Sequence, residues 1–96
     1  MIEVRSTEQY SRWYQRLRDR EAQSRILIRV RRLSLGNFGD VVPVGGGVSE
    51  LRIHYGPGYR VYFVRRGERI VILLGGGDKS TQDKDILAAK ALASTV

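Results

Sequence analysis

The 96-residue chain contains no cysteine and only one histidine. Without cysteine it can form neither a disulfide framework nor a thiolate zinc site, and it has no cysteine nucleophile. A single histidine also argues against a histidine-built metal site, so we expect neither a metal nor a cofactor. The chain lacks any run of about 18 apolar residues, which excludes a membrane-spanning helix. These absences, and the lack of the apolar core of a signal peptide near Met1, predict one cytoplasmic domain over residues 1–96.

Arginine, in contrast, is abundant. Of the 17 basic residues 14 are arginine, and against 10 acidic residues they give a formal net charge of +7. A positive net charge favours a polyanionic partner. The planar guanidinium of arginine can also form two parallel hydrogen bonds to phosphate oxygens. The composition therefore favours nucleic acid or another phosphate-rich partner. An acidic protein partner, or simply a basic soluble surface, is compatible with the same charge.

Residues 2–35 show the periodicity of a short strand followed by two helices. The strand is expected at 2–5, and Ser6 with Gln9 forms a capping-box pattern. Apolar residues then recur on one helical face in each segment, first Tyr10, Trp13, Tyr14 and Leu17, then Ala22, Ile26, Val30 and Leu33. The short connection within residues 18–21 favours an antiparallel helical hairpin. Arg29 and Arg32 lie on the polar side of the second helix, where they could contact RNA or a partner or be only solvated.

Residues 48–74 contain three apolar-rich runs separated by turn signals at 56–58 and 66–67. Alternate residues of a strand lie on opposite faces. The first set is Leu51, Ile53, Tyr55, Tyr59, Val61 and Phe63, and the opposite set is Glu50, Arg52, His54, Arg60, Tyr62 and Val64. The third run, 69–74, is apolar throughout, which is typical of a strand covered on both sides. The pattern predicts an antiparallel meander with Arg, His and Tyr groups on one surface. Residues 41–44 could add a short extended piece, and a last helix is expected over 81–94.

Residues 75–80, Gly-Gly-Gly-Asp-Lys-Ser, lie between a strand and a helix, which is the context of a phosphate-binding P-loop. That motif requires glycine directly before the lysine, and this chain has Asp78 there. We therefore expect no nucleotide-binding loop. A helix N-terminus beside Lys79 could still hold one backbone phosphate, or Ser80 could simply cap the helix.

The polar face of the meander suits metal-free cleavage of RNA, in which the substrate's own 2′-hydroxyl is the nucleophile. Such a site must move protons, as histidine, a carboxylate or tyrosine can, and must stabilise charge on the phosphate, as arginine and lysine can. The candidate catalytic residues are Arg52, His54, Arg60 and Lys79, and the candidates for substrate binding are Glu50, Tyr62, Arg29 and Arg32. Each has an ordinary alternative: His54 could be a surface histidine, Glu50 could pair with Arg60 or act as a base, and Tyr62 could only pack.

Several of these segments resemble the RelE/ParE superfamily of bacterial toxins, and most closely its HigB-like addiction-module killer branch. The residues that carry the resemblance are 35–40, 45–52, 56–63 and 74–82, followed by Asp85-Ile86 and Ala89. The similarity runs nearly end to end. It implies an α+β fold, with an N-terminal helical hairpin packed on a twisted antiparallel sheet of about four strands plus a C-terminal helix.

The resemblance also implies an activity. RelE- and HigB-like toxins cleave mRNA in the ribosomal decoding site without a metal, and a cognate antitoxin, usually encoded beside the toxin, binds and neutralises them. Arg60 matches the arginine of the family's Tyr-Arg motif, and it is expected on the surface that faces RNA. Several RelE-like enzymes have a functional C-terminal tyrosine, but this chain has no tyrosine after Tyr62. His54 is therefore the candidate for proton transfer.

Two alternatives stay open within the same fold. A ParE-like toxin would inhibit DNA gyrase by binding and would cut no RNA. A non-catalytic domain would only bind a partner. The cluster of Arg52, His54, Arg60 and Lys79 favours the nuclease, because a gyrase binder does not require a phosphate-cleaving surface.

Overall fold

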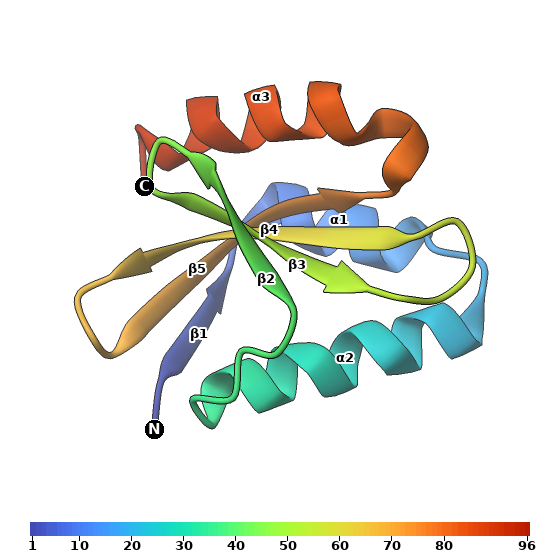
Figure 1. Ribbon diagram of the computed structural model, residues 1–96, viewed down its shortest axis with the longest axis horizontal. Helices are drawn as coiled ribbons and strands as arrows, with labels where there is room; N and C mark the ends of the chain where they lie inside the picture. The colour runs from blue at the N-terminus through green and yellow to red at the C-terminus, as the bar shows by residue number, and fades with distance from the viewer.

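The computed structural model describes residues 1–96 as a five-stranded mixed sheet with helices on both faces (Figure 1). The elements are β1 (Glu3–Ser6), α1 (Glu8–Arg16), α2 (Arg20–Ser34), β2 (Val41–Gly45), β3 (Val48–Ile53), β4 (Tyr59–Arg66), β5 (Ile70–Gly77), a 3-10 turn η1 (Lys79–Thr81) and α3 (Gln82–Ala93). The strand order is β1-β5-β4-β3-β2. The α+β class is therefore confirmed. No helix is both long and apolar enough to cross a membrane.

The sheet differs from the expected one at its two edges. The meander β3-β4-β5 is antiparallel as predicted, and the extended piece after the second helix forms the edge strand β2. The opposite edge is β1, which pairs with β5 in parallel. The sheet thus has five strands rather than about four and is mixed rather than antiparallel.

Two apolar clusters hold the helices to opposite faces of the sheet. Leu51 and Ile53 of β3 lie in the first cluster, together with residues of α1 and α2. Tyr62 of β4 lies in the second cluster, together with Ala89 and Ala93 of α3. The predicted alternation of strand faces is confirmed, because these two sets fall on opposite sides. The second face is not open, however, because the small side chains of Ala89 and Ala93 let α3 pack closely upon it.

The first two helices do not form a closely packed hairpin. They share one face of the sheet, but α1 packs mainly on β5 whereas α2 packs on β3. Where they meet, the Tyr14 hydroxyl donates to the Gln23 carbonyl at 3.0 Å, and the Gln23 amide donates to the Tyr14 carbonyl at 2.9 Å. In Figure 1, α2 and α3 lie on opposite sides of the sheet, and the N-terminus lies near the C-terminal end of α2.

The cap of α1 is Thr7 rather than the expected Ser6, because β1 continues through Ser6. The Thr7 hydroxyl accepts from the Tyr10 amide at 3.2 Å and donates to the Leu73 carbonyl at 2.8 Å, so it joins the helix start to β5. We expect Thr7→Ala to lower the free energy of unfolding by about 1 kcal/mol. Ser6→Ala is the matched control, and urea denaturation measures both. An equal effect of the two substitutions would contradict the assignment of the cap.

Candidate active site

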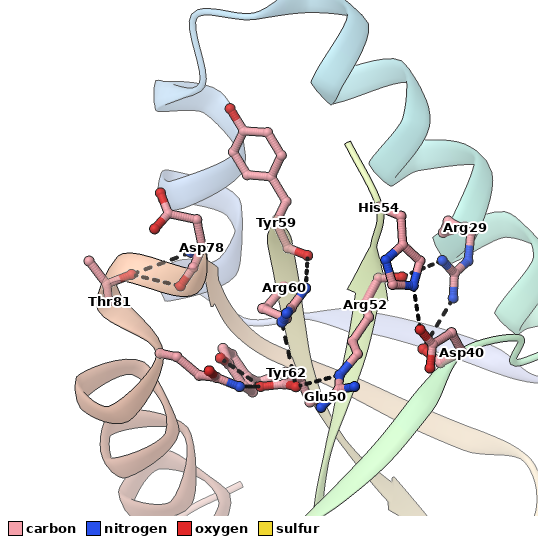
Figure 2. Close-up of polar contacts among 11 residues, drawn as sticks. Arg29, Asp40, Glu50, Arg52, His54, Tyr59, Arg60, Tyr62, Asp78 and Thr81 are labelled. Atoms are coloured by element: carbon pink, nitrogen blue, oxygen red, sulfur yellow. Dashed lines mark hydrogen bonds and ion pairs between the residues drawn. The ribbon is translucent and has the colours of Figure 1, made fainter. Parts of the chain in front are cut away.

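A buried carboxylate lies at the centre of the polar face. The Glu50 side chain is fully buried, and its Oε1 lies 3.0 Å from Arg52 Nε and 3.5 Å from Arg60 Nε. Its Oε2 accepts from the Tyr62 hydroxyl at 3.2 Å and from the Gln82 amide at 2.8 Å. Figure 2 shows Arg52 and Arg60 converging on Glu50 from neighbouring strands. One carboxylate thus holds two guanidinium groups, a phenol and the first turn of α3.

The register of the sheet explains this convergence. In the antiparallel pair β3-β4, Glu50 lies opposite Tyr62 and Arg52 lies opposite Arg60. Directly opposed side chains on one face lie within about 5.5 Å at their Cβ atoms, so two adjacent rungs of the ladder bring all four groups together. Gln82 completes the set from the helix that covers this face, because the first residue of α3 lies next to Glu50.

The expectation that these residues lie on an open surface is wrong for three of them. Arg60 is only 5% exposed, and Glu50 and Tyr62 have no exposed surface. The physical reason is the close packing of α3 on this face, which the strand alternation alone does not reveal. The Arg60–Glu50 pairing left open by the sequence does form, as an ion pair in which Arg60 Nε makes no hydrogen bond.

Tyr62 serves here as a hydrogen-bond donor. Burial, and then the neighbouring Glu50 carboxylate, raise the pKa of Tyr62 well above its ordinary value. The phenol therefore stays protonated at neutral pH and donates to Glu50. This argues against Tyr62 as a proton acceptor in this arrangement. Glu50, the other candidate base, is fully buried and already accepts from Tyr62 and Gln82, so His54 stays the proton-transfer candidate.

His54 lies just beyond the end of β3 and is held by a carboxylate that the sequence reasoning did not select. Its Nε2 lies 2.5 Å from Asp40 Oδ2, and the side chain is 72% exposed. The hydrogen bond to His54 is the main reason why the pKa of Asp40 lies below its usual range, so the carboxylate is ionised. An ionised Asp40 accepts a hydrogen bond from Nε2–H, which leaves Nδ1 as the free ring nitrogen.

Arg29 ties the same region to α2. Its guanidinium donates to the carbonyls of Arg52, Phe38 and Asp40, the latter two at 3.3 and 3.4 Å. It therefore fixes the segment before β2 against the end of β3. Arg32 is exposed one helical turn further on, where it lines a hollow of about 360 Å³ together with Arg25, Arg29 and His54. The Arg29 guanidinium is thus occupied by backbone carbonyls, whereas the exposed Arg32 is available to bind a ligand.

A second hollow, of about 410 Å³, lies around the β3-β4 turn. It brings together three of the four candidate catalytic residues, His54, Arg60 and Lys79. The Lys79 side chain lies across Gly58, where an added Cβ would stand 2.9 Å from Lys79 Cγ and where φ is +80°. Arg52 does not line this hollow and reaches the site only through Glu50. No carboxylate lines the hollow, so its walls favour an anion.

The 3-10 turn η1, which precedes α3, is capped by a side-chain anion. Asp78 caps η1, accepting from the Ser80 amide at 2.8 Å and the Ser80 hydroxyl at 2.5 Å. Its own amide donates to Thr81 Oγ1, which completes a capping box. The cap is therefore Asp78 rather than Ser80. The Asp78 carboxylate already accepts from the Ser80 amide of this turn, which disfavours a phosphate at that position, whereas the N-cap of α3, Thr81, makes no side-chain cap hydrogen bond.

Two residues that contact the candidate site, Asp40 and Gln82, are not among those that the sequence indicates. Their contacts to His54 and Glu50 span 14 and 32 residues of the chain, so no spacing rule points to them. The only signal was their position inside segments 35–40 and 74–82, which carry the family resemblance. No group of three or more His, Cys, Asp or Glu side chains is arranged to hold a metal ion.

Comparison with known proteins shows the family of the chain. The family described as phage derived protein Gp49-like (DUF891) matches residues 14–95. An uncharacterized protein of Haemophilus influenzae is 49% identical over 92 residues, which cover 96% of this chain and 93% of that protein. The chain therefore belongs to the Gp49-like family, a toxin-like family of the RelE/HigB type.

Proposed function

We propose that this chain is the toxin of a type II toxin-antitoxin system and cleaves mRNA on the ribosome without a metal. The observation that carries the proposal is the hollow lined by His54, Arg60 and Lys79. It offers two cations, of which Arg60 is held in place by Glu50, and one imidazole, and it contains no carboxylate. Membership of a toxin-like family supports the biological role, and the net charge of +7 suits a target made of RNA.

The proposed reaction places the scissile phosphate in this hollow. Nδ1 of His54 accepts the proton of the ribose 2′-hydroxyl, and O2′ attacks phosphorus. The O2′–P bond forms as the P–O5′ bond breaks, giving a 2′,3′-cyclic phosphate. The leaving O5′ takes a proton from the imidazolium or from water. Lys79 and Arg60 stabilise the charge that develops on the phosphate oxygens.

The buried carboxylate contributes by orientation. Arg60 cannot adopt many rotamers, because it is 5% exposed and its Nε faces Glu50 at 3.5 Å. A cation fixed before the substrate arrives needs no reorganisation during the reaction. Arg52 neutralises the remaining charge of Glu50, so the trio of two arginines and one carboxylate keeps one net positive charge beneath the hollow.

The partners in this proposal are the ribosome with its mRNA and a cognate antitoxin protein in a hetero-oligomer. The exposed arginines of α2, including Arg32, extend the positive surface from the hollow along the helix. RNA phosphates and an acidic antitoxin would both be attracted to such a surface. Binding of an antitoxin there would compete with the ribosome.

Brief induction of the protein in bacteria, with mapping of new 5′ ends across the transcriptome, tests the proposal. We expect cuts at fixed positions within translated codons. Lys79→Ala should reduce the cutting roughly 10²-fold, because one stabilising cation is lost, whereas Lys84→Ala, on the exposed side of α3, should leave it unchanged. Growth arrest without new 5′ ends would point instead to inhibition of gyrase, and neither arrest nor cuts would point to a binding domain.

A further inference from the structure

The edge strand β1 has one unpaired side. Glu3 N donates to Arg69 O at 2.6 Å and Thr7 N to Leu73 O at 3.1 Å, so the odd-numbered residues face β5. Backbone groups of alternate residues point to opposite sides of a strand. Val4 and Ser6 therefore present their N–H and C=O groups to the open side. Such an edge is a template for a further strand.

An apolar groove of about 360 Å³ runs beside this open edge. It is formed by β1, α1, α2 and β5, and its lining includes Val4, Tyr10, Tyr14, Leu27, Val30 and Arg31. Leu27 is 57% exposed although it is a large apolar side chain. The groove therefore offers pockets for alternate side chains of an added strand, directly next to the backbone groups that would pair with it.

The other edge of the sheet lacks these features. β2 contains Pro43, which has no N–H to donate, and its pairing with β3 is shifted between Pro43 and Gly45. Proline and bulges are devices that protect an edge from further pairing. The asymmetry between the two edges directs an added strand to β1.

The charge of the groove defines its partner. Arg31 is the only charged residue that lines it, and its guanidinium makes no ion pair. It stands on a helix with five arginines, Arg20, Arg25, Arg29, Arg31 and Arg32, against one acid, Glu21. A second copy of the chain carries the same net charge of +7 and would be repelled. An acidic polypeptide is the complementary occupant.

We propose that an extended, acidic segment of the antitoxin pairs with the open edge of β1, places apolar side chains against Leu27 and Val30, and sets a carboxylate against Arg31. This inference rests on the proposed function for the identity of the partner. The site lies at the edge farthest from β2 and contains none of His54, Arg60 and Lys79. The segment would thus anchor the antitoxin while leaving the active-site hollow to another part of it.

Amide hydrogen exchange tests the site, with the purified chain and the purified protein encoded beside its gene as the probe. The amides of Val4 and Ser6 should exchange fast in the free chain and become protected in the complex, whereas those of β2 should not change. Arg31→Glu should weaken binding about tenfold. Arg18→Glu is the matched control, because Arg18 is an exposed arginine outside the groove.

The outcomes separate this inference from the proposed function. Tight binding with protection elsewhere, for example at Gly75 and Gly76 of β5, would overturn the β1 site and keep the antitoxin. Equal binding by the Arg31→Glu and Arg18→Glu variants would also overturn it. Absence of any binding would overturn the partner itself. The 5′-end mapping would still test the nuclease in that case, because it needs no antitoxin.

Discussion

Glu50→Ala is expected to lower the free energy of unfolding by about 3–5 kcal/mol, because it removes one partner of a buried ion pair. Arg60, only 5% exposed, would lose its counter-charge. The Tyr62 hydroxyl and the Gln82 amide would lose their acceptor in the same step. Urea denaturation of the purified variant measures the loss.

Two controls identify the cause. Glu21→Ala removes an exposed carboxylate that pairs with Arg25 one helical turn away, and it should cost about 0.5 kcal/mol or less. Glu50→Gln keeps the shape of the side chain and one acceptor oxygen. Its loss in free energy of unfolding should therefore fall between the losses for Glu50→Ala and Glu21→Ala. If Glu50→Ala lowered the free energy of unfolding by less than about 1 kcal/mol, the ion pairs of Glu50 with Arg52 and Arg60 would not stabilise the fold as argued.

The sequence predicted the sheet best where its signals are local. The two-residue alternation of β3 and β4 determines which side chains share a face, and the turn residues between the strands determine that they pair with their sequence neighbours. The parallel pairing of β1 with β5 has no such signal, because residue 3 meets residue 70. A four-residue strand with so distant a partner can be assigned only once the rest of the sheet exists.

The site was predicted less completely, for a related reason. The ladder of the hairpin brings Glu50, Arg52 and Arg60 together, so their proximity could be anticipated from the alternation. The burial of Glu50 and Arg60 could not be anticipated, because it depends on where α3 packs. The apolar face of that helix was visible as Ile86, Ala89 and Ala93, but the choice of sheet face is a tertiary property. The error about exposed Arg60 follows directly from this.

This error also changes how Arg60 can be tested. Arg60→Ala would leave the Glu50 carboxylate buried with Arg52 as its one remaining cation. Any loss of toxicity would then mix a catalytic effect with unfolding. His54 and Lys79 are exposed, so substitutions there separate activity from stability.

His54→Ala should therefore reduce the cleavage rate about 10²–10⁴-fold, the contribution of a positioned proton-transfer group, without unfolding the protein. The side chain is 72% exposed and lies in neither apolar cluster. Cleavage of mRNA on purified ribosomes, followed in time, measures the activity. The melting temperature of the same preparation should match that of the unsubstituted chain.

The role of Asp40 distinguishes proton transfer from simple binding by His54. Asp40→Asn removes the ionised acceptor that keeps the proton on Nε2 and leaves Nδ1 free. It should lower the cleavage rate, while RNA affinity stays near that of the unsubstituted chain. Full cleavage by the His54→Ala variant would assign the proton to another group. A loss confined to affinity would make His54 a phosphate contact, with catalysis resting on Arg60 and Lys79.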